Sequence, residues 1–223
     1  MRLTVEHKTH YRYEYPAYHA VQSLKLTPAE FEGQKILRWS ITAEGCNIGA
    51  EFTDGNGDII STLTSNGPVE AIEIVVTGEV ETTDTAGVLR GHKERAFPAV
   101  FLRTTPMTKS SAAIRKLADK VAKKTKDGTV LELAHGLAAA VADAIEYAPG
   151  TTHVHTTAAD AIADGKGVCQ DHAHVLISAA RHLGIPARYV SGYLFADHEG
   201  KPHEASHAWA ELHLPEFGWV GFD

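Results

Sequence analysis

The chain has 223 residues, of which 43% are hydrophobic and 22% charged, a composition typical of a folded globular protein with one large or two ordinary domains. The formal net charge of −7 provides no general attraction for nucleic acid or for an anionic membrane surface. No apolar run is long enough for a signal peptide or a membrane span, so we expect a cytoplasmic protein that binds neither nucleic acid nor membranes.

Residues 1–83 contain strand-like segments separated by turns. Apolar and polar residues alternate over 2–15, and three further segments have the same character, at 21–28, 36–45 and 69–81. The sequence DGNGD at 54–58 is a strong signal for a hairpin turn. The pattern predicts an N-terminal antiparallel β-sandwich over residues 1–83.

Residues 84–107 are predicted to be a linker, because they contain glycines and prolines without a clear periodicity. After them the pattern changes from strands to helices. We therefore expect a second domain over residues 108–223.

This second domain is predicted to begin with helices. Residues 112–125 and the Ala- and Leu-rich stretch 130–148 have helical spacing, and a short third helix is expected at 157–165. The expected capping residues are Ser110 or Ser111 for the first helix, Thr157 for the third, and Gly165 as its stop.

A fourth helix and three strands complete the predicted α+β domain. The helix begins near Cys169, and its apolar residues recur at helical spacing until Gly184 and Pro186. Strand-like segments follow at 187–195, 207–214 and 218–223.

Cys169 lies in the first turn of this fourth helix. Unpaired backbone N–H groups and the positive end of the helix dipole stabilise a thiolate there. Gly165 and Gly167 precede it, and glycine permits a positive φ or a close approach to another element. A free cysteine is more commonly a small buried apolar residue, and on Cys169 alone that interpretation remains open.

A thiol enzyme also needs a base and a group that orients the base. His207 lies in one strand-like segment and Asp223 ends the next. If these strands are adjacent and antiparallel, the two side chains can meet on one face of the sheet. A hydrogen-bonded strand histidine and a solvated carboxylate are the alternatives.

Together these residues resemble the core of the transglutaminase-like superfamily, whose bacterial members are often described as cysteine proteases. The motifs occur in order: G-x-C-Q-D-x-A at 167–173, G-I-P-A-R-Y-V-S-G-Y at 184–193, H-A-W at 207–209 and G-W-x-x-F-D at 218–223. The first half, with residues 7–28, L-R-W at 37–39 and DGNGD, resembles the β-rich region that precedes this core in bacterial relatives.

The resemblance implies a papain-like arrangement. Cys169 would attack an amide or acyl carbonyl of a protein or peptide, His207 would act as base and then acid, and Asp223 would orient His207. Water or an amine would resolve the thioester, which means hydrolysis or transamidation; protein-glutamine γ-glutamyltransferase activity and a catalytically silent binding module are the alternatives. No cofactor is implied. Gln170 and Asp171 follow the nucleophile and Trp209 follows the base, where they can line the cleft or support the site.

Two features depart from the family pattern. Papain-type enzymes have a Gln six residues before the nucleophile as an oxyanion donor, whereas Ala163 lies there in this chain. Relatives usually continue past F-D with Pro and further strands, so we expect the sequence to be truncated after Asp223.

The chain contains 14 histidines, so metal sites have to be considered. We do not expect one. The candidate groups are His153 with His155, Asp171 with His172 and His174, and His203 with His207. His172 and His174 point about 200° apart on a helix, and no spacing supplies three or four convergent ligands. Surface or cleft positions are the preferred interpretation, and Cys46 is expected to be inert.

Overall fold

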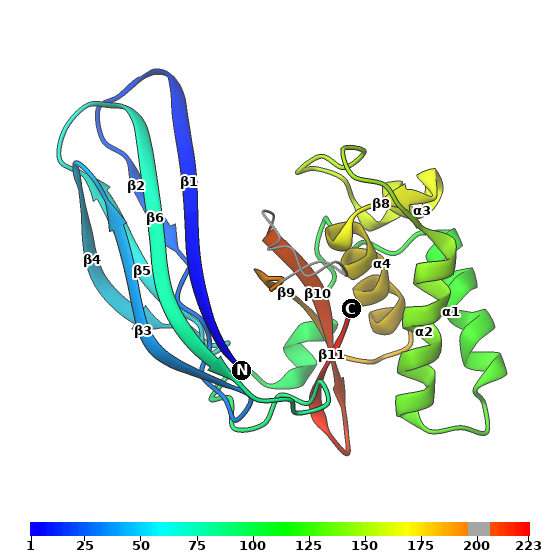
Figure 1. Cartoon of the computed structure of the whole chain (residues 1–223). Coiled ribbons are helices and arrows are strands. Elements are labelled where there is room, and N and C mark those ends of the chain that lie inside the picture. Colours follow the sequence, from blue (N-terminus) through cyan, green and yellow to red (C-terminus); the bar gives the residue numbers. More distant parts are fainter. Residues whose placement is uncertain (196–205) are drawn as a thin grey trace. The chain divides into compact units, whose positions relative to one another are not determined.

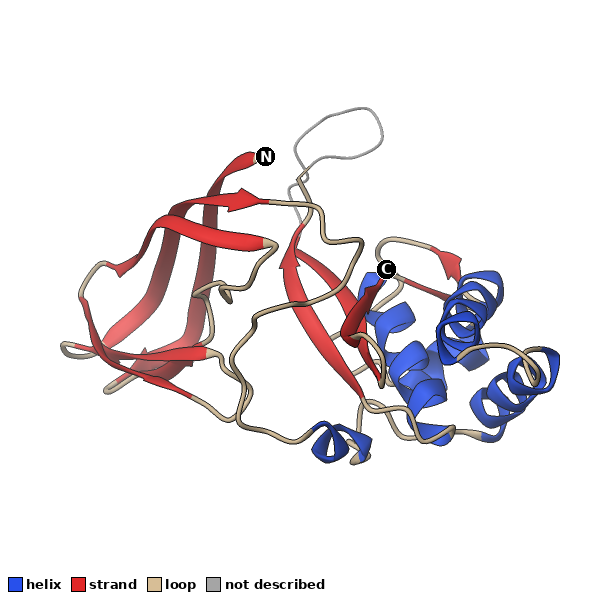
Figure 2. Ribbon diagram, turned by 90° about the horizontal axis from the view of Figure 1, so that it is seen from below, coloured by secondary structure: helices blue, strands red, loops and turns tan. Residues whose placement is uncertain are grey.

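The computed structural model describes residues 1–195 and 206–223 (Figure 1). The chain divides into two compact units, Met1–Ala96 and Phe97–Asp223. The first contains strands and the second contains helices followed by strands, as the colouring of Figure 2 shows. This arrangement confirms the predicted α+β class.

The first unit is a β-sandwich of two antiparallel sheets with three strands each. One sheet has the order β1 (Arg2–Ala17), β6 (Val69–Thr82), β3 (Gln34–Ala43), and the other β2 (Val21–Leu24), β5 (Ile59–Ser65), β4 (Cys46–Thr53). Leu63 from one sheet and Ile72 and Ile74 from the other are almost fully buried between them. This arrangement confirms the predicted antiparallel β-sandwich.

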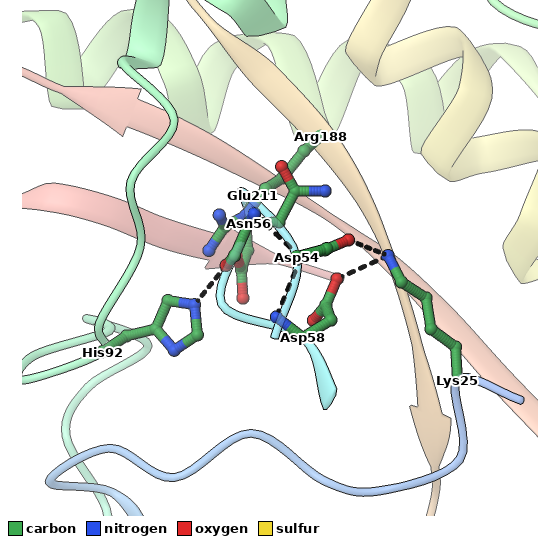
Figure 3. Close-up of polar contacts among 7 residues, drawn as sticks. All are labelled: Lys25, Asp54, Asn56, Asp58, His92, Arg188 and Glu211. Carbon is green, nitrogen blue, oxygen red and sulfur yellow. Dashed lines mark hydrogen bonds and ion pairs between the residues drawn. The ribbon is translucent and has the colours of Figure 1, made fainter. Parts of the chain in front are cut away.

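The DGNGD sequence forms the turn between β4 and β5, as predicted. Asp54 Oδ1 accepts hydrogen bonds from the backbone N–H groups of Asn56, at 2.8 Å, and Asp58, at 3.0 Å. Lys25 Nζ binds the carboxylates of Asp54 and Asp58, and His92 Nε2 contacts the Asn56 carbonyl (Figure 3). Burial acts to raise the pKa of Asp54, but the hydrogen bonds from Lys25 and the two backbone N–H groups outweigh it and lower that pKa.

The second unit begins with a short 3₁₀ helix, η1 (Pro98–Leu102), inside the segment predicted as linker. Pro98 favours this helix start because its ring fixes φ and it has no N–H to leave unpaired. The helices that follow are α1 (Ala112–Lys124), α2 (Val130–Ala144), α3 (Ala158–Asp164) and α4 (Cys169–His182).

The caps of these helices agree with the sequence signals. The Ser111 hydroxyl accepts a hydrogen bond from the Ile114 N–H, and Thr157 and Asp160 form a reciprocal capping box at α3. Gly165 ends α3 with φ at +65°. Among the described residues, no helix is long and apolar enough to cross a membrane.

The strands of the second unit form one antiparallel sheet of order β11 (Gly218–Phe222), β10 (Ser206–Leu214), β9 (Ala187–Tyr193), and a short parallel pair joins β7 (Glu146–Tyr147) to β8 (Lys166–Gly167). Helix α4 packs against β9, β10 and the other three helices. Most of its side chains are buried, including Val175, Ile177 and Ala179. The helix that carries Cys169 is therefore the central element of this unit.

Strand β10 has two different faces. Ala208, Ala210 and Leu212 are buried, and the alternate positions carry His207, Trp209 and Glu211. Glu211 pairs with Arg188 of β9 at 2.8 Å, a pair drawn in Figure 3, and both side chains are largely buried. Strand alternation therefore puts His207 and Trp209 on the same face.

Candidate active site

The two glycines before Cys169 have different roles. Gly165 ends α3 in the left-handed region, which an L side chain rarely adopts. At Gly167 an added Cβ would lie 2.6 Å from the Asp171 side chain. One glycine therefore turns the chain and the other allows α4 to begin close to β8.

Cys169 is the first residue of α4, and two side chains of the same first turn contact the backbone of the residue before it. Asp171 is fully buried, and its Oδ2 accepts hydrogen bonds from the Val168 N–H, at 2.8 Å, and from the Thr152 hydroxyl. His172 Nδ1 lies 2.9 Å from the Val168 carbonyl oxygen, and its Nε2 lies 3.0 Å from the Ile145 carbonyl oxygen. Asp171 thus has the capping contact expected of an acid in a first helical turn.

His207 and Asp223 are in direct contact. His207 Nε2 donates to Asp223 Oδ2 at 2.5 Å, with 16% of the histidine side chain and 60% of the aspartate side chain exposed. Because Nε2 is used in this way, Nδ1 is the ring nitrogen left to accept a proton. The ring centroid of Trp209 lies 6.0 Å from that of His207.

Cys169 and Asp223 line one small cavity of about 50 Å³. His172 and Trp209 complete its polar side, and its apolar lining consists of Ala138, Val141, Ala142, Ala173, Leu176, Ala208 and Phe222. Gln170 is partly exposed in the first turn of α4, outside this lining. Cys169, Asp223 and Trp209 therefore line one cavity, and His207, which is not among the lining residues, is linked to it through its hydrogen bond to Asp223.

Two further side chains near Cys169 were not assigned to the site from the sequence. His174 is 8% exposed, and its ring lies 5.2 Å from that of Tyr189. Burial lowers the pKa of His174, although the Asp171 charge opposes this. Burial also raises the pKa of Tyr189, and the charges of Cys169 and Asp171 add to the increase. Both groups therefore favour their neutral forms.

Thr152 is the third side chain without an earlier assignment. It reaches Asp171 across 19 residues of sequence, so no local motif marks the contact.

The histidines that were considered as metal ligands have different surroundings. His153 and His155 are exposed, both ring nitrogens of His172 face carbonyl oxygens, and His203 lies outside the described residues. Within 1–195 and 206–223, no three His, Cys, Asp or Glu side chains are grouped as metal ligands. Cys46 is a free thiol at the beginning of β4, packed against the sandwich core.

Comparison with known proteins gives matches over both units. Residues 115–223 match the family model described as the transglutaminase-like superfamily, and residues 3–81 match that of the bacterial transglutaminase-like N-terminal region.

Individual relatives match the whole chain. An uncharacterized protein of Mycobacterium leprae is 29% identical over all of this chain and 82% of its own length, and one of Mycobacterium tuberculosis is 27% identical over all of this chain and 78% of its own. A crystal structure described as "a Putative Cysteine Protease from Cytophaga hutchinsonii" superposes with a TM-score of 0.74 at 24% identity, covering all of this chain and 76% of that one. At this identity the likeness concerns the fold.

Proposed function

Because the chain belongs to the transglutaminase-like superfamily, we propose that it is a thiol enzyme that acts on amide bonds of proteins or peptides through Cys169, His207 and Asp223. The observation that carries the proposal is the 2.5 Å hydrogen bond between His207 Nε2 and Asp223 Oδ2, with Asp223 on the wall of the cavity that Cys169 also lines. A base oriented by a carboxylate, with its second ring nitrogen available for a thiol proton, is the arrangement that activates a nucleophile.

The first half of the reaction forms a thioester. Cys169 gives its proton to Nδ1 of His207, and the sulfur attacks the carbonyl carbon of the substrate. The backbone N–H of Cys169 stabilises the oxyanion at the beginning of α4. When the C–N bond breaks, the His207 imidazolium returns its proton to the leaving amine, and the acyl group remains on Cys169. Asp223 keeps the ring oriented and balances its positive charge.

The second half decides the type of product. Water attacks the thioester in hydrolysis and gives a carboxylic acid, whereas a primary amine attacks it in transamidation and gives a new amide. We propose hydrolysis as the main outcome and transamidation as the alternative.

The type of product can be measured with p-nitrophenyl acetate as acyl donor, in the presence and absence of glycinamide. Acetate as the main product in both samples supports hydrolysis, and N-acetylglycinamide supports transamidation. A protein that forms no acyl-enzyme under either condition would act as a binding module instead.

Thiol reactivity tests the proposal without knowledge of the substrate. Iodoacetamide should alkylate Cys169 much faster than Cys46 in the same sample at neutral pH, because Cys169 begins a helix and has His207 as its proposed base. Peptide mapping by mass spectrometry after timed quenching gives both rates. Equal rates for the two cysteines would rule out the enzyme proposal.

A further inference from the structure

Val168, the residue directly before the nucleophile, has both of its backbone polar groups in contact with side chains that follow the nucleophile. Its N–H donates to Asp171 Oδ2 at 2.8 Å, and its carbonyl oxygen lies 2.9 Å from His172 Nδ1. These two side chains come two and three residues after Cys169. The two peptide groups that flank Val168, of which the second leads into Cys169, are therefore each in contact with one side chain.

Each of these side chains is also attached to a different part of the second unit. Asp171 Oδ2 accepts from the Thr152 hydroxyl, in the segment after β7, and His172 Nε2 lies 3.0 Å from the carbonyl oxygen of Ile145, the C-cap of α2. The first turn of α4 is thus connected to the β7–α3 segment and to the end of α2. We call Asp171, His172 and Thr152 the first-turn clamp.

Both ring nitrogens of His172 face carbonyl oxygens. Carbonyl oxygens only accept, so a ring nitrogen that carries a proton can donate to the oxygen it faces. Asp171 on α4, Asp223 on β11 and the Glu146–Lys166 pair at β7 and β8 are the neighbouring charged groups, and the Cys169 thiol lines the same cavity as His172.

The burial of Asp171 indicates a function beyond stability. Its side chain is fully buried, and no partner for Oδ1 is found among the described residues. A buried carboxylate carries a large desolvation cost, which an apolar residue at the same place would avoid. Gly167 lacks a side chain at the position where a Cβ would lie 2.6 Å from Asp171. The space around Asp171 is therefore shaped for this contact.

We infer that the first-turn clamp consists of positioning residues, which hold the Val168–Cys169 backbone so that the thiol and the Cys169 N–H both face the substrate carbonyl. This inference rests on the proposed function and adds three residues to it. It explains why polar side chains surround the start of a helix whose remaining length is mostly buried and apolar.

Thr152 offers a matched set of variants. Thr152→Val has nearly the same shape but no hydroxyl, whereas Thr152→Ser keeps the hydroxyl. Thr151→Val is the control, because the Thr151 hydroxyl donates to the Ala148 carbonyl, within the same segment. The iodoacetamide rate at Cys169, divided by that at Cys46, is the readout.

We expect Thr152→Val to lower this ratio roughly tenfold to a hundredfold, the effect of misplacing a reacting group by about 1 Å. Thr152→Ser should restore it and Thr151→Val should leave it unchanged. A Thr152→Val ratio equal to wild type would overturn the inference while leaving the proposed function intact, since the wild-type ratio alone tests that function.

His172→Phe gives a second, independent test. The variant keeps an aromatic ring but loses both ring nitrogens, and with them the contacts to the Val168 and Ile145 carbonyl oxygens. The ratio of the Cys169 rate to the Cys46 rate should therefore fall. His155→Phe, at an exposed histidine, is the control and should leave the ratio unchanged. A His172→Phe ratio equal to that of wild type would contradict the role of His172.

Discussion

The two ends of the candidate site are held by different means. At the nucleophile end, Cys169 follows a backbone fixed by Asp171 and His172 and begins a mostly buried helix. At the base end, His207 and Asp223 share one hydrogen bond, and the Asp223 side chain is 60% exposed. Burial and a polar clamp position the thiol, whereas strand pairing positions the imidazole.

Because of this difference, substitutions at the two ends should have different effects on the stability of the protein and on the reactivity of Cys169. Changes at the nucleophile end should alter both, because the polar groups there are buried and would be left unpaired. Changes at the base end should alter reactivity with a smaller loss of stability, because the Asp223 side chain is 60% exposed and the His207 side chain, 16% exposed, is less buried than Asp171. The variants below test this distinction, beginning with the largest expected effect.

His207→Ala should slow acylation and alkylation of Cys169 by roughly 10²–10⁴-fold, the usual contribution of a positioned general base. The midpoint of thermal unfolding should fall less than in Asp171→Ala, because Asp171 is fully buried and the His207 side chain is 16% exposed. His213→Ala is a matched control, because His213 lies on the same strand and contacts Trp219 away from Cys169. Timed alkylation followed by peptide mapping measures the rate, and similar rates for both variants would contradict the role of His207.

The two aspartates should have opposite profiles. Asp171→Ala leaves the Val168 N–H and the Thr152 hydroxyl without their acceptor and should lower the free energy of unfolding by about 1–3 kcal/mol per buried group. Asp223→Ala should change it by no more than about 0.5 kcal/mol and still lower the reactivity of Cys169. Urea unfolding and alkylation rates measure the two quantities. An equal loss of stability in both variants would contradict the proposed difference between the nucleophile end and the base end of the site.

Variants of the two glycines before Cys169 also test the distinction between effects on stability and effects on reactivity. Gly167→Ala would push Asp171 away and should lower both the free energy of unfolding, by about 1–3 kcal/mol, and the alkylation rate. Gly165→Ala forces an L side chain into a positive φ, at a cost of about 1–2 kcal/mol, but does not touch Asp171. We expect its alkylation rate to remain near wild type once the sample is folded, and a matching loss of rate would count against the role of Asp171.

The smallest predicted effect is that of His174 on the pH dependence of the free energy of unfolding. Burial lowers the pKa of His174 in the folded protein, so the unfolded chain binds more protons as pH falls. The stability associated with the neutral ring is present above the unfolded pKa of about 6.5 and is lost as pH falls below it toward the lowered folded pKa. His174→Gln should flatten this loss relative to wild type in urea unfolding at several pH values. An identical slope in both proteins would contradict it.

The sequence predicted the elements whose residues carry a local signal. Strand alternation identified the sandwich, and capping signals marked helix ends because capping depends on neighbouring residues: Thr157 and Gly165 for α3, and Ser110 or Ser111 for α1, of which the structure uses Ser111. The motifs around Cys169, His207 and Asp223 identified the family core in the same way.

Contacts between distant segments had no such signal. The Thr152 hydroxyl meets Asp171 only because α4 packs beside the segment after β7, and His172 reaches Ile145 across 27 residues. The two-residue strands β7 and β8 are too short to produce a pattern, and η1 is a single short 3₁₀ helix in an aperiodic segment. Tertiary packing decides these features, so they became visible only in the folded chain.

The central claim is that Cys169 forms an acyl-enzyme with the help of His207. Acid quenching after mixing with p-nitrophenyl acetate, followed by intact-mass measurement and peptide mapping, detects such a thioester directly. We predict one acetyl group per chain, located on Cys169, and almost none in His207→Ala within the same time. Acetylation that is absent, or that reaches Cys46 as fast as Cys169, would contradict the account.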